Sequence, residues 1–384
     1  MPEQTPTRAS LGEIAFVFLK LGTTAFGGPA AHIAMMEDEF VRRRQWLTEA
    51  EFLDRLAAAN LIPGPSSTEV AIFVGHAKRG WLGLIVAGCC FIIPAALIVT
   101  AIAWAYARYG SLPQAAGILY AIKPVVVAII LQAIWKFART GIKSIFFAIV
   151  AGLSVVVSFA GVSPIAVLLL AGMVAAIEHG IRHRPVAAAG FLPAIAASSA
   201  ATVATAMAVP VSLWRLGLSF LKIGSVVFGS GYVLLAFLHA EFIEKLHWLT
   251  EKQLIDAIAV GQFTPGPLFT TATFIGYLVA GWKGAVVGTI GIFLPGFLLV
   301  AVSGPLIPRL RKSATVSAAL DGVIAASIAL MVVVTWQLGR AAIVDRVTIV
   351  LFVLSAIVLL RFRVNSAWLI GTAGVLGWLW QAWR

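Results

Sequence analysis

Charged side chains are scarce in this chain. They make up 11% of its 384 residues, against about 25% in an average soluble domain. Hydrophobic residues reach 60%, and the mean hydropathy is +0.98. Folded in water, such a chain would expose far more apolar surface than soluble proteins do. The composition therefore excludes a soluble fold and predicts an all-α integral membrane protein that has the lipid bilayer as a partner.

Cysteine is also rare, and Cys89 and Cys90 are neighbours in an apolar run. Without a CxxC pair or a second cluster, neither a disulfide framework nor a metal site is supported. The sequence contains no HExxH, no GxSxG and no P-loop. We therefore expect no metal, no cofactor and no catalytic residue, so the protein is not expected to be an enzyme.

Acidic residues are fewer than basic ones, 16 against 28, which gives a formal net charge of +12. In a soluble protein this excess would suggest a nucleic-acid partner. Here most Lys and Arg lie between apolar segments, where the positive-inside bias and anionic headgroups account for them. We therefore expect no nucleic-acid partner.

The chain repeats itself with an offset of 202 residues, as from Lys20 to Lys222. FLKLG at 18–22 returns as FLKIG at 220–224, WLTE at 46–49 as WLTE at 248–251, and PGP at 63–65 as PGP at 265–267. One deletion later, Gly80-Trp81 matches Gly281-Trp282. Separate motifs in one register indicate a duplication. We predict one repeat over 10–190, a second over 212–384, and a weakly hydrophobic linker, 191–211, that is long enough to cross the membrane.

Each repeat contains the same series of segments, and together they give ten to thirteen membrane segments. The first three are a lysine-bearing apolar segment (11–36 and 212–238), a charged connector (37–55 and 239–256) and a Pro-Gly-Pro segment (56–77 and 257–279). Counts of Lys and Arg in the loops place the two repeats in opposite orientations. We therefore expect an inverted repeat. Whether the Pro-Gly-Pro segments cross the membrane or are re-entrant stays open.

The Pro-Gly-Pro triplets must break their helices. Proline lacks an N–H and pushes the preceding residue out of the helical region. A new helix can then start near Ser66, where free N–H groups and the positive end of the dipole favour an anion. Broken segments at matching places in two halves point to a transporter's binding site. Simple kinks in membrane spans are the alternative.

The candidate binding residues are those able to surround a tetrahedral dianion. Lys20 and Lys222 lie within matching apolar segments, where a charge usually faces the interior or a cavity. A structural ion pair is the alternative. Asn60 and Gln262, at matching positions, could donate amide hydrogen bonds. The full set is Lys20, Lys222, Gly27, Gly28, Asn60, Pro63, Gly64, Pro65, Ser66, Ser67, Thr68, Gln262, Pro265, Gly266, Pro267, Thr270 and Thr271.

Glu69 and Lys123 are candidates for gating or coupling. A carboxylate beside an anion site opposes binding unless it is paired or protonated. The alternative for Glu69 is a capping box with Ser66, which has the required spacing. Lys123 has no charged counterpart in the second repeat, where Ile324 is in register, and it could equally pair with a carboxylate.

Several motifs resemble the chromate ion transporter family in its long, two-domain form. They are GGPAAHI at 27–33, WLTEAEF at 46–52 and PGPSST at 63–68, with looser matches at 228–231, 248–250 and 265–267. The resemblance implies a multi-pass protein of the bacterial cytoplasmic (inner) membrane that exports chromate and confers chromate resistance. Sulfate is the close chemical analogue of this oxyanion. One departure is Ser230-Gly231, which stands where the first repeat has Gly28-Pro29.

Other functions stay open at this point. The protein could carry sulfate or another inorganic anion, inward as well as outward. An intramembrane enzyme acting on lipid phosphates would need a base or nucleophile, for which Glu69 and His76 are the only weak candidates. The oligomeric state, a homodimer included, is not fixed by the sequence.

Overall fold

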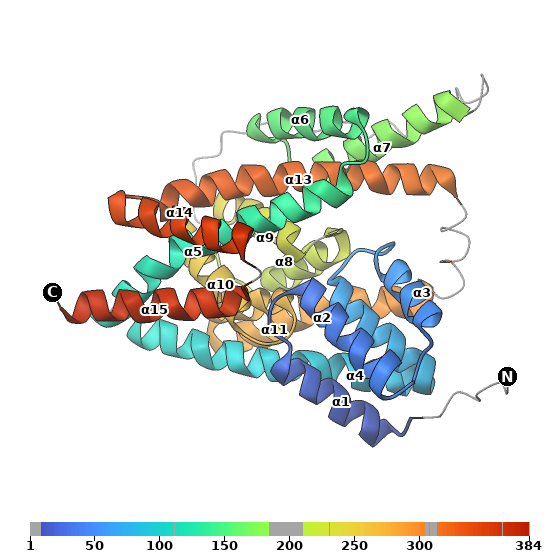
Figure 1. The fold of residues 1–384 in the computed structure, drawn as a ribbon, viewed down its shortest axis with the longest axis horizontal. Coiled ribbons are helices and arrows are strands. Elements are labelled where there is room, and N and C mark those ends of the chain that lie inside the picture. The colour runs from blue at the N-terminus through green and yellow to red at the C-terminus, as the bar shows by residue number, and fades with distance from the viewer. Residues whose placement is uncertain are drawn as a thin grey trace.

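The computed structural model describes residues 9–110, 112–183, 210–229, 231–303, 307, 313–362 and 364–383. Within these ranges the regular structure is helical and no strand occurs, so the expected all-α class is confirmed (Figure 1). The expected linker, 191–211, lies almost wholly outside the described residues.

The helices repeat as the sequence does. The first repeat contains α1 (Leu11–Thr24), α2 (Pro29–Glu37), the π-helix η1 (Asp38–Arg43), α3 (Glu49–Ala59), α4 (Ser66–Tyr109), α5 (Pro113–Gly141), α6 (Ile145–Phe159) and α7 (Pro164–His183). The second contains α8 (Leu213–Val226), η2 (Gly231–Val233), α9 (Leu234–Leu238), the π-helix η3 (His239–Lys245), α10 (Glu251–Phe263), η4 (Leu268–Thr270), α11 (Thr271–Ser303), α13 (Ala314–Ala342), α14 (Arg346–Arg361) and α15 (Ser366–Ala382). The two halves are therefore copies of one fold.

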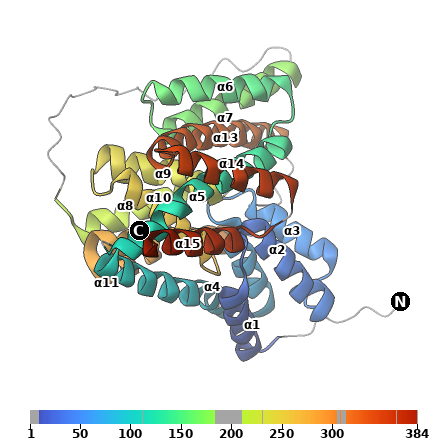
Figure 2. The ribbon, with the colours of Figure 1, turned by 60° about the vertical axis from the view of Figure 1, so that its left-hand side comes forward.

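The two repeats are inverted relative to each other. In Figure 1, α5 and α7 run toward the right of the view, whereas their counterparts α13 and α15 run toward the left. The 29-residue helix of each repeat, α5 or α13, packs against the last two helices of the other repeat. The helix α5 contacts α14 and α15, while α13 contacts α6 and α7. Figure 2 shows α6, α7, α13 and α14 stacked on one side of the molecule and α1 and α4 on the other. Since each repeat completes the packing of the other, neither forms a separate body.

Five described helices are long and apolar enough to cross a membrane. They are Ser66–Tyr109, Pro113–Gly141, Pro164–Arg182, Leu268–Ser303 and Ala314–Ala342. By contrast, α1 and α8 have 14 residues each. That is about 21 Å, against a hydrocarbon core of about 30 Å. The expected ten to thirteen membrane segments therefore include several that are shorter than a full span.

The apolar segment 11–36 is not one helix. It ends its first helix at Thr24, turns through Gly27 and Gly28 at φ 104° and 80°, and restarts at Pro29. Positive φ is readily adopted only by glycine, which explains the paired glycines at this turn. Lys20 consequently lies in the last turns of a short helix and not in the middle of a span.

The Pro-Gly-Pro segments form helical hairpins. The long helix α4 breaks at Arg79 and Gly80, and Gly80 has φ 58°. The short helix 66–78 then folds back on 81–109, with Gly75 against Gly83 so closely that a Cβ on either would overlap the other's backbone. In α11 the break at Ala280 and Gly281 does the same. At the triplet itself, α3 leads in and the short helix 66–78 leads back out. This is the arrangement expected of the re-entrant alternative.

Candidate functional site

The two Pro-Gly-Pro tips are held by reciprocal hydrogen bonds between the repeats. The N–H of Gly64 donates to the carbonyl of Val227 at 2.8 Å, and the N–H of Gly266 donates to the carbonyl of Ala25 at 2.9 Å. Ala25 and Val227 are the residues at which α1 and α8 end. Each Pro-Gly-Pro tip therefore donates a hydrogen bond to a free carbonyl at the end of the other repeat's first helix. We call this meeting point the crossing.

His32 connects the two tips. Its Nε2 lies 3.1 Å from the carbonyl of Ala25, the same oxygen that accepts from Gly266, and its Nδ1 lies 3.4 Å from Oγ of Ser67. A carbonyl can only accept, so Nε2 carries the hydrogen and the neutral ring accepts at Nδ1 from the Ser67 hydroxyl. The side chain is buried. The sequence analysis did not select His32 for the site, although its place in the GGPAAHI motif was a signal that could have found it.

Several buried polar atoms at the crossing have no hydrogen-bond partner among the described residues. They are Oγ1 of Thr68, both carboxyl oxygens of Glu69 and Nε2 of Gln262. The carboxyl of Glu69 lies over Gly64 and close to Gly296 of α11. Orphaned polar atoms are rare in protein interiors, and their clustering here points to groups reserved for a ligand or a proton.

The capping-box alternative for Glu69 is wrong. Ser66 lies inside the helix, the N-cap is Pro65, and no side chain caps the helix start. The Ser66 hydroxyl instead donates to the carbonyl of Gly229 at 3.4 Å. The N–H groups of Thr68 and Glu69 bond to the carbonyl of Pro65. The N–H groups of Ser66 and Ser67 are therefore left as open donors at the start of α4.

The first-repeat tip is more accessible than the second. Pro63 and Ser66 are half-buried, and Pro65, Ser67 and Thr68 are buried. On the second tip Pro265, Gly266, Pro267, Thr270 and Thr271 are all buried.

The threonines of the second tip are also engaged. Their hydroxyls donate to the tip's own backbone, Thr270 to Pro267 and Thr271 to Leu268, each at 2.8 Å. Of the hydroxyls at the two tips, that of Thr68 alone has no partner among the described residues.

The matching amides differ in the same way. Asn60 is exposed at the end of α3. Gln262 is buried, and its Oε1 accepts from the Tyr232 hydroxyl at 3.2 Å. Gly27 is exposed and Gly28 half-buried beside the Tyr232 hydroxyl. The structure brings Gln262 and Gly28 toward one tyrosine and leaves Asn60 apart.

Both lysines adopt the ion-pair alternative. Nζ of Lys20 lies 3.5 Å from Oε2 of Glu39, and Nζ of Lys222 lies 2.9 Å from Oε2 of Glu241. The two carboxylates sit in the π-helices η1 and η3, at equivalent places. The lysine side chains remain 46% and 45% exposed, against 9% for each glutamate. The ammonium groups can therefore still face a passing anion from their open side.

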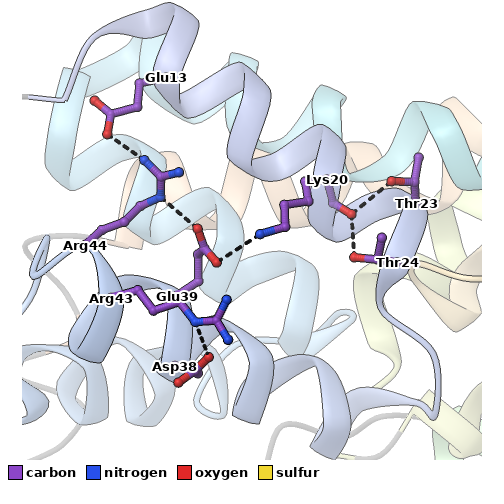
Figure 3. A network of polar contacts seen from close by, with 8 residues as sticks. All are labelled: Glu13, Lys20, Thr23, Thr24, Asp38, Glu39, Arg43 and Arg44. Carbon is purple, nitrogen blue, oxygen red and sulfur yellow. Dashed lines mark hydrogen bonds and ion pairs between the residues drawn. The ribbon is translucent and has the colours of Figure 1, made fainter.

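A network surrounds the first of these pairs (Figure 3). Oε1 of Glu39 accepts from Nε of Arg44 at 2.8 Å, and Arg44 also bonds Glu13 at 2.7 Å. Burial opposes ionisation of Glu39, but the hydrogen bond from Arg44 and the charge of Lys20 hold the pKa of its carboxyl below the usual value. The hydroxyl of Thr24 donates to the backbone of Lys20 at 2.7 Å. The local charges are thus largely balanced within the protein.

Lys123 pairs with a carboxylate from the other repeat. Its Nζ lies 3.4 Å from Oδ1 of Asp256 on α10, and the hydroxyl of Tyr106 donates to Oδ2 at 2.9 Å. Both charged side chains are largely buried. A buried pair of this kind holds its two helices in one arrangement, because separating the charges is costly.

The chain is similar to known proteins over nearly its whole length. A family model described as chromate transporter matches residues 12–177 and 214–378. A chromate transport protein of Cupriavidus metallidurans is 33% identical over 377 residues, which cover 96% of this chain and 92% of that protein. A probable chromate transport protein of Synechococcus elongatus is 32% identical over 371 residues, 94% and 91% of the two chains. A chromate transport protein of Pseudomonas aeruginosa is 28% identical over 393 residues, 98% and 94%. No solved structure matches.

His239 anchors the π-helix that presents Glu241. Its Nε2 lies 2.7 Å from Glu251 and its Nδ1 3.3 Å from Glu244. Burial opposes a charged ring, but the two carboxylates outweigh it and raise the pKa of His239 to about 9. Because the folded protein holds this proton more tightly than the unfolded chain, the stabilisation is full below the unfolded pKa of about 6.5 and is lost as pH rises through about 9.

We therefore expect His239→Gln to lower the thermal midpoint strongly at about pH 6 and only slightly at about pH 10. Unfolding of the purified protein in detergent, followed across this range, measures the difference. Lys252→Gln, which changes an exposed residue in the first turn of α10, serves as the control. An equal shift at both ends of the range contradicts the assignment.

Proposed function

Because the chain belongs to the chromate transporter family, we propose that it is a secondary transporter that exports chromate across a bacterial cytoplasmic (inner) membrane and so confers chromate resistance. The observation that carries this proposal is the crossing, where the two inverted repeats meet through their broken hairpins. Inverted-repeat transporters bind their substrates at such discontinuous helices. No cofactor is needed, because the work is binding and movement.

The anion would pass the first-repeat side of the crossing. The open N–H groups of Ser66 and Ser67, the hydroxyl of Thr68 and the amide of Gln262 supply donors that have no acceptor among the described residues. A dianion favours such a site because charge-assisted hydrogen bonds are stronger than neutral ones. Lys20 and Lys222 would balance part of its charge from the open sides of their ion pairs.

Alternating access would come from rocking the repeats about the crossing. Two backbone hydrogen bonds, from Gly64 and Gly266, join the tips across the repeats. Each contributes roughly 1 kcal/mol net, which is small enough to exchange during a transport cycle. The buried pair of Lys123 and Asp256 would act as a second contact that opens or closes with the repeats.

Chromate and sulfate share charge and shape, so flux must decide between them. We expect energised inside-out vesicles containing the protein to accumulate labelled chromate in a saturable way, with excess sulfate as the competitor. Vesicles lacking the protein are the control. Uptake only by right-side-out vesicles would reverse the proposed direction, and labelled sulfate carried in preference to chromate would replace the proposed substrate.

A double variant separates an anion-facing role of Lys222 from a purely structural one. We expect Lys222→Ala to reduce chromate flux about tenfold, the effect of roughly 1.4 kcal/mol, because one charge near the substrate is lost. The change Lys222→Ala/Glu241→Ala removes the whole pair and should not restore flux. Lys245→Ala is the matched control, since Lys245 bonds the same carboxylate at 2.9 Å. Full recovery in the double variant would assign Lys222 to the ion pair alone.

Glu69 is proposed as the coupling group. A fully buried carboxyl without a hydrogen-bond donor favours the protonated acid. Its ionisation would oppose the anion, which links proton release to substrate movement. We expect Glu69→Gln to keep the fold and to carry chromate with a flat pH profile, because glutamine mimics the neutral acid. Flux measured over a pH series tests this, with Thr100→Val as the control, since the Thr100 hydroxyl bonds only the backbone of its own helix farther along α4. A pH profile identical to that of the unchanged protein would remove Glu69 from coupling.

A further inference from the structure

A pocket of 490 Å³ lies between α5 and the connection from α14 to α15. None of the residues that the sequence suggested for the site lines it. The side-chain amide of Gln132 on α5 donates to the carbonyl of Leu359 at 2.5 Å and fastens the two walls together. The pocket is therefore a built feature of the packing between the repeats, since α5 belongs to the first and α14 to the second.

Among the described residues that line this pocket, three are cations and none is a carboxylate. They are Lys136, Arg139 and Arg361, and none has an ion pair within the described part of the chain. By contrast, Lys123 and Lys143, on or beside the same helix, pair with aspartates. Since this chain balances its other lysines near α5, an uncompensated group of three cations calls for an external anion.

Aromatic rings hold the two guanidinium groups. Cζ of Arg139 lies 5.1 Å from the centre of the Trp135 ring, and Cζ of Arg361 lies 5.9 Å from that of Phe362. A ring covers the face of a guanidinium and leaves the N–H groups at its edge free to donate. These donors suit the oxygens of a planar or tetrahedral oxyanion.

The equivalent pocket of the second repeat lacks this charge pattern. It has a volume of 370 Å³ and lies between α13 and the connection from α6 to α7. Gln337 takes the place of Lys136, and Ala160 is in register with Arg361. Lys222, Lys245 and His239 line this second pocket together with the carboxylates of Glu241 and Glu244, which pair with them. The uncompensated positive charge is therefore a property of one pocket and does not follow from the fold.

Residues next to the pocket lining contact the turns around the crossing. Asn365 follows the last residue that lines the pocket, and it packs against Gly27. The Nδ2 of Asn365 lies 3.6 Å from the position that a Cβ on this glycine would occupy. Phe137, between Lys136 and Arg139, packs against Gly229. The carbonyl of Gly229 accepts the hydroxyl of Ser66. An anion held here is thus next to the turns that surround the crossing.

We propose that this pocket is a second oxyanion site, which binds a free inorganic dianion such as chromate or sulfate beside the crossing. The proposal rests on the proposed function, because it supplies a loading position for the same substrate. In an inverted repeat, equivalent pockets face opposite sides. A cationic pocket on one side and a charge-balanced one on the other would collect the dianion from one side and release it at the other.

The direct test is anion binding to the purified full chain in detergent. We expect sodium sulfate, a redox-inert probe, to raise the thermal midpoint above that in sodium chloride at matched ionic strength. Lys136→Gln/Arg361→Gln should raise the half-effective sulfate concentration about tenfold or more, as expected from lost charge-assisted hydrogen bonds. Lys136→Gln installs the residue that the second repeat carries. Arg340→Gln, the counterpart of Arg139, is the matched control and should respond as the unchanged protein does.

The headgroups of anionic lipids also carry oxyanions, so a second experiment tests them as the ligand of this pocket. The same variants are reconstituted with phosphatidylcholine alone or with added phosphatidylglycerol. Stabilisation by phosphatidylglycerol that needs Lys136 and Arg361, with no response to sulfate, would overturn the proposal and make the pocket a headgroup site. An unchanged sulfate response in the double variant would overturn it as well.

Chromate flux separates this proposal from the proposed function. If the unchanged protein carries chromate and the double variant has the same KM, the pocket proposal fails and the function stands. If the unchanged protein carries no chromate, the function fails whatever the pocket binds. A KM raised about tenfold with little change in the maximal rate supports both.

Discussion

Two backbone hydrogen bonds, from Gly64 to Val227 and from Gly266 to Ala25, set the geometry on which the rest of this structure depends. Each bond requires a glycine with positive φ in the middle of a Pro-Gly-Pro triplet, because a residue with a side chain would be strained there. The φ angle is 137° at Gly64 and 90° at Gly266. Each bond also requires a first helix that stops inside the protein and presents a free carbonyl. The short α1 and α8, the proline-bounded tips and the folded-back helices together make this exchange possible.

Charge follows from the same arrangement. A lysine near the end of each short helix would be costly in an apolar interior, and a glutamate from the following π-helix lies within 3.5 Å of each. The pairs leave half of each lysine accessible, so neutralisation and substrate attraction are compatible. The cations of the pocket beside α5 are different, because aromatic rings orient Arg139 and Arg361 without balancing their charge.

Duplication did not keep the two halves equal. Ser67 and His32 bond at the first tip, whereas leucine occupies the position equivalent to His32 in the second repeat. Thr270 and Thr271 use their hydroxyls on their own backbone, while Thr68 keeps its hydroxyl free of partners among the described residues. The two tips have therefore diverged in their polar contacts, a difference that an exact symmetric dimer could not provide.

The membrane class, the duplication and the helix breaks could all be predicted from the sequence. These follow from composition, from register and from proline's missing N–H, all of which are local or periodic properties. The predicted Pro-Gly-Pro segments end just before Gly80 and Gly281, where the turns lie, but the sequence left open whether these segments cross or fold back. The stop of α1 before Gly27 was not foreseen, because an apolar run reads alike whether it crosses or folds back. The pairing of Lys20 with Glu39, the pairing of Lys123 with Asp256 and the position of His32 between the two tips were seen only in the folded structure. Such contacts join residues up to 133 positions apart, from Lys123 to Asp256, and depend on how inverted halves pack. No local pattern carries that information, since the partner's position is fixed by the fold and not by spacing along the chain.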